Sequence, residues 1–309
     1  MAVEALAPRA SFLVAGLLLD ALIGDPQFRF HPIRLIGNTL AAAENFLRRM
    51  RWDGYGGGCV LFLFLTAAWV LLPSLLVVWA GAVLHILFVY VFFALRNLID
   101  HVRAVRGDID SARRAIAMLV GRDTARMDLY ACRRAAVESL SENFVDGFLS
   151  PLFWYALLGI PGLLLFKVVS TMDSMVGYKT PQYVRFGWCG ARFDDVMNYV
   201  PARLSWIILG MSALPFRALS ATKGWKIGLE QHAVLPGPNP GWSEATMAGL
   251  LQRRLIGPIW KDGAVVTKLW IGDPNDPEGG SDEDVRNAIL VTIVAAVLSL
   301  IGVISVIRG

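Results

Sequence analysis

Long apolar runs alternate with charged segments along the chain, and this alternation predicts a protein that crosses a membrane several times. The longest run covers residues 59–95. It is too long for one crossing, because a helix needs about 20 apolar residues to span a bilayer core. Pro73-Ser74 lies near its middle, so we expect a helical hairpin of two short spans. Arginines flank the run on both sides, which predicts that both ends face the cytoplasm.

Two further runs lie near the ends of the sequence. Residues 288–307 predict a C-terminal span, and residues 11–23 form a shorter run that contains Asp20. A carboxylate in lipid is costly, so we expect Asp20 to face protein or the membrane interface. The following GDPQFRFHP is a poor cleavage region for a signal peptide, which favours a retained first helix.

Two other apolar runs are interrupted. Residues 151–170 are broken by GIPG at 159–162, and residues 196–219 contain Asn198, Pro201 and Arg203. Irregular backbone at membrane depth is tolerated only where it is buried in protein or lines water. Each run therefore either crosses once or dips into the membrane and returns.

The remaining segments are polar. Residues 96–148 predict an insert of two polar helices, separated by GRDT at 121–124. Residues 220–287 predict a long polar loop rich in glycine and proline, whose tryptophans argue against disorder. The predicted fold is mainly α: a polytopic integral membrane protein with about four to five apolar helical segments, polar cytoplasmic helices and a long polar loop, in a single domain of residues 1–309.

The composition supports this fold class. Hydrophobic residues make up 55% of the chain and charged residues only 17%, against about 25% charged residues in soluble proteins. The net charge of +4 argues against a nucleic-acid partner. Three scattered cysteines without a CxxC spacing support neither a disulfide framework nor a zinc knuckle. The glycine-rich GxxxxGK[ST] and GxGxxG phosphate-binding motifs do not occur.

An acidic stripe lies in the second polar helix. Glu138, Glu142 and Asp146 are four residues apart, so they share one helical face, and Asn143 adds a neutral oxygen nearby. Oxygen ligands suit Mg²⁺, which commonly takes one or two carboxylates together with substrate phosphates. A solvated acidic face explains the same spacing.

A second acidic group occurs in FDDVMN, where Asp194 and Asn198 are one helical turn apart and Asp195 is adjacent. It is either a second half of the same metal site or a pair that caps the start of a helix. The position of a second acid beside an apolar run favours the metal site.

Basic residues surround this second acidic group. Lys179, Arg185, Arg192 and Arg203 suit phosphate, because lysine supplies a point charge and arginine a planar fork of donors. Interfacial arginines also extend toward lipid headgroups, so each one alone is ambiguous. The acids and bases together predict a magnesium–phosphate site.

Two other segments carry possible site residues. GDPQFRFHPIRLIG contains Asp25, His31 and Arg34 and predicts an ordered interfacial loop, although a lone histidine is more often structural than catalytic. HAVLPGPNPGWSEATMAGLL contains His232, Asn239 and Glu244.

Several long motifs together resemble one family. They are GDPQFRFHPIRLIG, ESLSENFVDGFLSPLFWYALLGIPG, TMDSMVGYK, FGWCGARFDDVMNYVPARL and PNPGWSEATMAG. From about Leu17 to Gly257 the chain resembles the CobD/CbiB family of cobalamin biosynthesis proteins, the adenosylcobinamide-phosphate synthases.

The resemblance implies an amide-forming ligase. Members of this family join (R)-1-amino-2-propanol, or its O-phosphate, to the propionate carboxylate of adenosylcobyric acid, and the product is adenosylcobinamide or its phosphate. ATP is a co-substrate and Mg²⁺ a cofactor. A carboxylate is a poor electrophile, and its phosphorylation gives an acyl phosphate that an amine attacks.

The resemblance also implies residue roles, partners and a location. The expected catalytic residues are Asp194, Asp195, Asp173 and His31; the expected substrate or phosphate ligands are Lys179, Arg185, Arg192, Arg203, Asn198 and Arg34; the expected metal ligands are Glu138, Glu142, Asp146 and Asp194. The expected partners are the corrinoid, the amine, the lipid bilayer and other late enzymes of the pathway, such as a decarboxylase that produces aminopropanol phosphate. The expected location is the bacterial cytoplasmic membrane, with the site facing the cytoplasm.

Two other interpretations stay open. Paired aspartates near apolar helices also fit a Mg²⁺-dependent membrane transferase that acts on a lipid or prenyl phosphate. That class would need two DxxxD-type motifs on separate spans, and only one adjacent pair occurs. The other interpretation is a non-enzymatic membrane protein, either a scaffold for late corrinoid enzymes or a transporter, although the repeated halves typical of transporters do not occur in the sequence.

Overall fold

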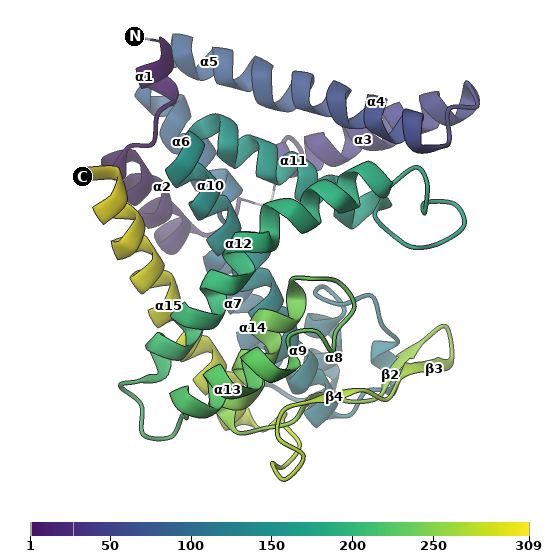
Figure 1. Cartoon of the computed structure of the whole chain (residues 1–309), viewed down its shortest axis with the longest axis vertical. Helices are drawn as coiled ribbons and strands as arrows, with labels where there is room; N and C mark the ends of the chain where they lie inside the picture. The colour runs from purple at the N-terminus through teal and green to yellow at the C-terminus, as the bar shows by residue number, and fades with distance from the viewer. Residues whose placement is uncertain (1, 27, 309) are drawn as a thin grey trace. The chain divides into compact units, whose positions relative to one another are not determined.

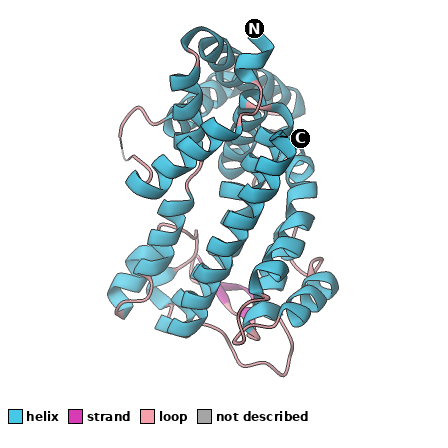
Figure 2. Ribbon diagram, turned by 90° about the vertical axis from the view of Figure 1, so that its left-hand side faces the viewer, coloured by secondary structure: helices cyan, strands magenta, loops and turns pink. Residues whose placement is uncertain are grey.

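The computed structural model describes residues 2–26 and 28–308 and is mainly helical, as Figure 2 shows. The predicted helical membrane fold is confirmed. The described residues form two compact units. Unit 1 holds those within residues 1–94, 150–198 and 303–309, and unit 2 holds residues 95–149 and 199–302.

Unit 1 consists of helices joined by turns and loops (Figure 1). In it α2 packs along α6, and Asp20 is buried, so this carboxylate faces protein. Its elements are α1 (Ala2–Leu6), α2 (Ala10–Ile23), α3 (Pro32–Arg49), α4 (Tyr55–Thr66), a π-helical turn (Ala67–Leu71), α5 (Leu72–Ala80), α6 (Ala82–Phe92), α10 (Ser150–Leu158), α11 (Ile160–Val176), the first part of α12 (Trp188–Ala213) and the end of α15 (Asp282–Arg308).

Four helical stretches among the described residues are long and apolar enough to cross a membrane: Glu4–Ile23, Tyr55–Ala80, Ala82–Ala104 and Asp282–Arg308. The two spans expected within residues 59–95 are present, but they are separated at Gly81 and not at Pro73. Pro73 lies in the first turn of α5, directly after the π-helical turn, where proline is tolerated. Gly81 has φ +68°, a conformation that favours glycine.

The two interrupted runs behave differently. Residues 151–170 break at Gly159, where φ is +67°, and the helices on either side, α10 and α11, pack against each other. The interruption expected there is confirmed. By contrast, α12 continues as one helix through Pro201 to Ala213.

Unit 2 contains the polar segments. The insert at 96–148 holds three α-helices where two were expected, because Asp108 accepts hydrogen bonds from Asp110 N and Ser111 N and so starts an extra helix. The segment expected to be a loop, residues 220–287, holds two helices and four short strands. The elements of unit 2 are α7 (Leu95–Ala104), α8 (Ile109–Ile116), a 3₁₀ turn (Thr124–Arg126), α9 (Leu129–Phe144), a π-helical turn (Val145–Leu149), the rest of α12, α13 (Ala221–Gln231), α14 (Pro240–Leu251), β1 (Leu255–Ile256), β2 (Ile259–Lys261), β3 (Ala264–Thr267), β4 (Trp270–Ile271) and most of α15.

The strands form two small antiparallel pairs, β1 with β4 and β2 with β3. The first pair lies against α9 and α14. This pairing places the backbone of Ile256 next to side chains of α9, which lies more than 100 residues earlier in the chain.

Candidate functional site

The predicted site residues divide between the two units. Unit 1 contains His31, Arg34, Asp173, Lys179, Arg185, Arg192, Asp194, Asp195 and Asn198, and unit 2 contains Glu138, Glu142, Asp146 and Arg203.

A closed loop joins α11 to α12 in unit 1. A Cβ on Gly187 would lie 1.7 Å from the carbonyl oxygen of Val176, so the two ends of the loop meet at backbone distance and only glycine fits. Inside the loop, the backbone N–H of Val184 donates to the carbonyl of Thr180 at 2.8 Å. Compact loops whose ends meet are frequently functional. We call residues 178–186 the α11–α12 loop.

Two of the expected phosphate ligands lie on this loop. Lys179 and Arg185 are exposed, and neither side chain forms an ion pair with the described residues. Arg48 of α3 holds the loop in place: its guanidinium donates to the carbonyl of Gln182 at 3.2 Å and lies 4.6 Å from the centroid of the Phe186 ring. The loop therefore presents two cations to solvent on a fixed backbone.

The acidic residues of unit 1 lie on α11 and α12. Burial raises the pKa of Asp173, and the nearby carboxylate of Asp195 raises it further. Arg192 Nη1 donates to Asp195 Oδ2 at 3.3 Å. Asp173 of α11 therefore lies near Asp195 of α12, and Arg192 of α12 pairs with Asp195.

Asp194 is fixed through Asn198. Asn198 Nδ2 donates to Asp194 Oδ2 at 3.0 Å, and Ser150 Oγ donates to Asn198 Oδ1. Asn198 is buried, so it orients Asp194 and does not itself face solvent. Because α12 begins at Trp188, two turns earlier, the interpretation of Asp194 and Asp195 as a helix cap is wrong.

His31 lies at the start of α3, and its Nε2 is 3.0 Å from Asp25 Oδ1. The ring is buried and packs edge-on against Phe28. These contacts hold the loop before α3, and the exposed Arg34 follows one turn later. The catalytic role of His31 stays a prediction.

Glu138 of unit 2 has a structural role. Its Oε2 accepts from Arg122 Nη2 at 2.7 Å, and its Oε1 accepts from the backbone N–H of Ile256 at 2.9 Å. Burial raises the pKa of Glu138, and the charge of Arg122 opposes this rise. Oε1 therefore holds β1 against α9, and Oε2 holds Arg122, which lies just before the 3₁₀ turn.

The other two acids of the stripe have different surroundings. Glu142 is exposed, and Asp146 is half-buried in the π-helical turn, whose larger number of residues per turn changes the angular register of the stripe. Among residues 2–26 and 28–308, no three His, Cys, Asp or Glu side chains are placed to hold a metal together. The metal roles of Glu142 and Asp146 stay predictions.

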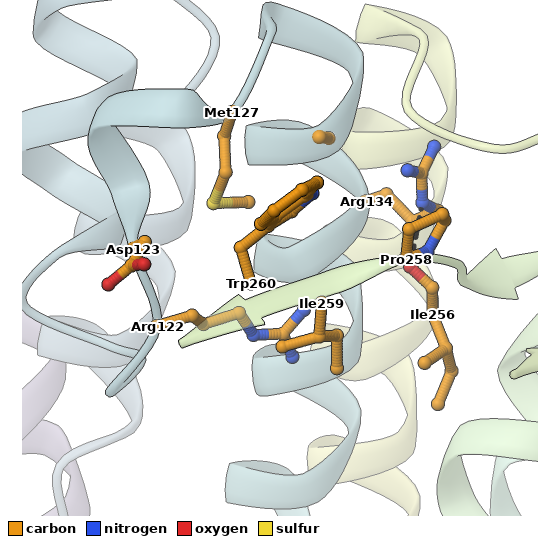
Figure 3. Close-up of a pocket in the computed structure, with 9 residues that line it drawn as sticks. Arg122, Asp123, Met127, Arg134, Ile256, Pro258, Ile259 and Trp260 are labelled. Atoms are coloured by element: carbon orange, nitrogen blue, oxygen red, sulfur yellow. Dashed lines mark hydrogen bonds between the residues drawn. The ribbon is translucent and has the colours of Figure 1, made fainter. Parts of the chain in front are cut away.

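A pocket lies beside the Arg122–Glu138 pair, and Figure 3 shows its lining. Arg134 and Trp260 contribute to its wall, together with Met127 and apolar residues around Ile259. Arg134 Nε donates to the carbonyl of Ile256 at 2.9 Å, and its Nη1 donates to that of Gly279 at 3.2 Å. Burial lowers the pKa of Arg134. Arg134 thus supports the backbone of the strand region directly, and Arg122 supports it through Glu138.

Arg203 is also engaged by protein groups. Its Nη1 donates to the carbonyl of Tyr199 at 2.8 Å and to Asn239 Oδ1 at 3.1 Å. Its guanidinium carbon lies 3.5 Å from the centroid of the Tyr199 ring. Arg203 therefore fixes the loop before α14, which the expectation of a phosphate ligand did not anticipate.

Among the buried charged residues, Lys167 and Glu244 had no role assigned to them from the sequence. Lys167 is 9% exposed in α11, and Glu244 is 6% exposed in α14. The signal in each case is one ionisable residue within an apolar or small-residue run, LLLFKVV and GWSEATMAGLL. Such residues are costly to bury, so they are functional candidates.

Comparison with known proteins places the chain in a family. Residues 13–292 match the family model described as CobD/Cbib protein. Relatives that carry the name Cobalamin biosynthesis protein CobD match most of the chain. The chain is 38% identical over 298 residues to that of Sinorhizobium sp, which covers 90% of this chain and 92% of the relative. It is 38% identical over 310 residues to that of Pelobacter propionicus, with 95% of each covered.

A third relative, from Geobacter metallireducens, is 39% identical over 277 residues, which covers 86% of this chain and 87% of the relative. No solved structure matches the chain. The chain belongs to the CobD/CbiB protein family.

Proposed function

We propose that this chain is a membrane enzyme of cobalamin biosynthesis, an adenosylcobinamide-phosphate synthase. It joins (R)-1-amino-2-propanol or its O-phosphate to the propionate carboxylate of adenosylcobyric acid, with ATP as co-substrate. The observation that carries this proposal is the family match over residues 13–292, together with relatives named as cobalamin biosynthesis proteins over almost their whole length.

The α11–α12 loop supports a phosphate-binding role for unit 1. Lys179 and Arg185 are exposed on a loop whose backbone is fixed at both ends. Positioned cations stabilise charge that develops on a transferring phosphoryl group. These two side chains would therefore hold the phosphates of ATP.

Two carboxylates of unit 1 support the proposal of a bound Mg²⁺ ion. Asp173 and Asp195 repel each other, and a divalent cation beside them would offset both this repulsion and the cost of burying Asp173. Mg²⁺ in nucleotide sites commonly takes only one or two protein carboxylates. Asp173 and Asp195 would hold the ion, with Asp194 oriented nearby by Asn198. The bound ion would neutralise phosphate charge.

The proposed reaction has two steps. A propionate oxygen attacks the γ-phosphorus of ATP, and ADP leaves, which gives an acyl phosphate. The amine nitrogen then attacks the acyl carbon, inorganic phosphate leaves, and the nitrogen loses its extra proton. Lys179 and Arg185 stabilise the phosphoryl group in the first step and the departing phosphate in the second.

The proposal is tested with the full-length protein purified in detergent. It is mixed with adenosylcobyric acid, Mg²⁺-ATP and aminopropanol phosphate, and the corrin mass is followed by mass spectrometry. We expect a product heavier by the amine minus water, absent when ATP is omitted. An unchanged corrin mass with ATP present would contradict the proposal. Asp194→Asn and Glu142→Gln then test the predicted site residues.

The orientation is tested by cysteine labelling. Because ATP is cytoplasmic, a cysteine at the exposed Thr180 is expected to react only with a reagent on the cytoplasmic side. Ala82→Cys, directly after the break between two spans, is the control and is expected to react only from outside. Cys132 and Cys189 are buried and Cys59 is half-buried, so the protein without an added cysteine is labelled in parallel as the background. Labelling of Thr180→Cys from outside would contradict the assigned orientation.

A further inference from the structure

Glu244 is a buried ionisable group in unit 2 that the proposed mechanism does not use. It lies on α14, where every residue from Gly241 to Leu251 is buried, and it is 6% exposed. Its carboxyl group forms no hydrogen bond with the described residues, since burial and neighbouring charges alone set its electrostatics. A buried carboxyl without a partner lowers stability, so the fold itself does not require it.

The charges that face Glu244 from α9 are mostly negative. Glu142 and Glu138 both raise the pKa of Glu244, and only Arg122 opposes them. Arg122 already pairs with Glu138 at 2.7 Å. The charged groups around Glu244 on the α9 side therefore favour the binding of a cation.

Among the described residues, no cation from the other elements beside α14 pairs with Glu244. On α12, Arg203 donates to the carbonyl of Tyr199 and to Asn239 Oδ1. α13 approaches through Gly224 and Gly228, which have no side chains. Lys223 of α13 pairs instead with Asp276 at 2.6 Å and with Asp273 at 3.1 Å. β1 contributes the apolar residues Leu255 and Ile256.

The geometry favours an organic cation over a metal ion. Within the part of the chain that the structure describes, no three acidic, histidine or cysteine side chains converge to hold a metal ion by protein groups alone. An ammonium group carries a single positive charge and up to three N–H donors. One carboxylate is therefore enough to balance its charge and to accept one or two of its hydrogen bonds. Glu142, the first acidic neighbour of Glu244, is exposed, so the group lies close to solvent on that side.

We propose that the Glu244 carboxylate binds a small organic ammonium group. This inference rests on the proposed function, whose acceptor substrate is a primary amine that carries a positive charge near neutral pH. Glu244 would hold the ammonium group through N–H···O hydrogen bonds, and Glu142 would contribute charge from the solvent side.

The test uses the full chain in detergent with Glu244→Gln, which keeps the side-chain shape and removes the charge. Two measurements are made: the KM for 1-amino-2-propanol phosphate in the amide-forming assay, and the shift in Tm caused by 1-amino-2-propanol alone. 1,2-Propanediol, which has the same skeleton without the ammonium group, is the ligand control. Glu230→Gln, an exposed glutamate of α13, is the protein control.

We expect Glu244→Gln to raise the amine KM at least tenfold while the KM for ATP stays unchanged. We also expect 1-amino-2-propanol to raise the Tm of the wild type and of Glu230→Gln but not of Glu244→Gln, and 1,2-propanediol to shift none of them. A folded Glu244→Gln with the wild-type amine KM and Tm shift would overturn the inference. An equal Tm shift with NaCl or MgCl₂ in place of the amine would also overturn it.

The two proposals fail separately. If the wild type forms no amide but still shows the amine-specific Tm shift that Glu244→Gln loses, only the proposed function fails. If the wild type forms amide and Glu244→Gln keeps its amine KM, only the role of Glu244 fails. Glu244→Asp guards against a folding defect, because it keeps the charge and is expected to retain part of the amine-specific shift.

Discussion

The arginines of unit 2 and the basic residues of the α11–α12 loop have the same chemistry but different surroundings. In unit 2, Arg122 and Arg134 donate to Glu138 and to backbone carbonyls, so their hydrogen bonds hold the fold together. In unit 1, Lys179 and Arg185 point into solvent from a loop that Arg48 and Gly187 fix. A basic residue therefore indicates anion binding only where protein groups do not already use its donors.

The largest expected effect concerns the structural side of this comparison. Glu138→Ala leaves Arg122 and the N–H of Ile256 without their acceptor. We expect the free energy of unfolding to fall by about 3–5 kcal/mol, as for other broken buried ion pairs. Chemical denaturation in detergent measures this loss, with Glu230→Ala as the exposed control. A loss no larger than the control's would show that Glu138 is not structural.

The second half of the comparison, anion binding by the α11–α12 loop, is tested by removing its two exposed cations. Lys179→Ala and Arg185→Ala each remove a charge that has no protein partner among the described residues. We expect kcat/KM for ATP to fall about 10–100-fold, the loss of one charged hydrogen bond, with no change in Tm. Arg185→Lys separates charge from geometry, because it keeps the charge and loses the planar fork. A drop in Tm with unchanged kinetics would assign these residues to the fold.

The backbone contact that closes the loop gives a smaller effect on stability. Gly187→Ala places a Cβ 1.7 Å from the carbonyl oxygen of Val176, so the loop must shift. We expect a loss of about 1–3 kcal/mol, as for other overpacked sites, together with lower activity. Gly56→Ala is the control, since no atom lies within 4 Å of its added Cβ. Equal Tm values for the two variants would show that the close contact between Gly187 and Val176 does not fix the loop.

The smallest expected effect is a gain in stability. Burial and acidic neighbours raise the pKa of Glu244 in the folded state well above its ordinary value of 4.5. The folded state therefore keeps a proton that the unfolded state loses above about pH 4.3, so stability falls as the pH rises from there to the folded-state pKa. Glu244→Gln removes this slope and is expected to raise stability at pH 7 by on the order of 1 kcal/mol. Identical Tm–pH curves for wild type and variant between pH 4 and 8 would contradict the assignment.

Hydropathy along the chain predicted the membrane class and the number of spans between residues 55 and 104, because lipid imposes a long apolar run on any crossing helix. It misplaced the break at Pro73, since a π-helical turn that accommodates a proline has no simple sequence signal. The stripe of Glu138, Glu142 and Asp146 assumed a regular helix, and the π-helical turn changed its register.

The functional residues were harder to assign from the sequence than the helices. The contact of Glu138 with Ile256 joins positions 118 residues apart, and it depends on how β1 packs against α9. The same holds for Arg134 and Gly279, which are 145 residues apart. Local spacing identified Asp194 and Asn198 correctly as neighbours, because a helix fixes that contact within one turn.

The most direct test of the account is the ratio of products formed by the purified protein. Adenosylcobyric acid, aminopropanol phosphate and Mg²⁺-ATP are incubated with the enzyme, and amide, ADP and inorganic phosphate are measured in the same samples. An ATP-dependent ligase that proceeds through an acyl phosphate is expected to release one ADP and one phosphate for each amide bond. Amide formation without ATP, or ADP release that does not depend on the corrin and the amine, would contradict it.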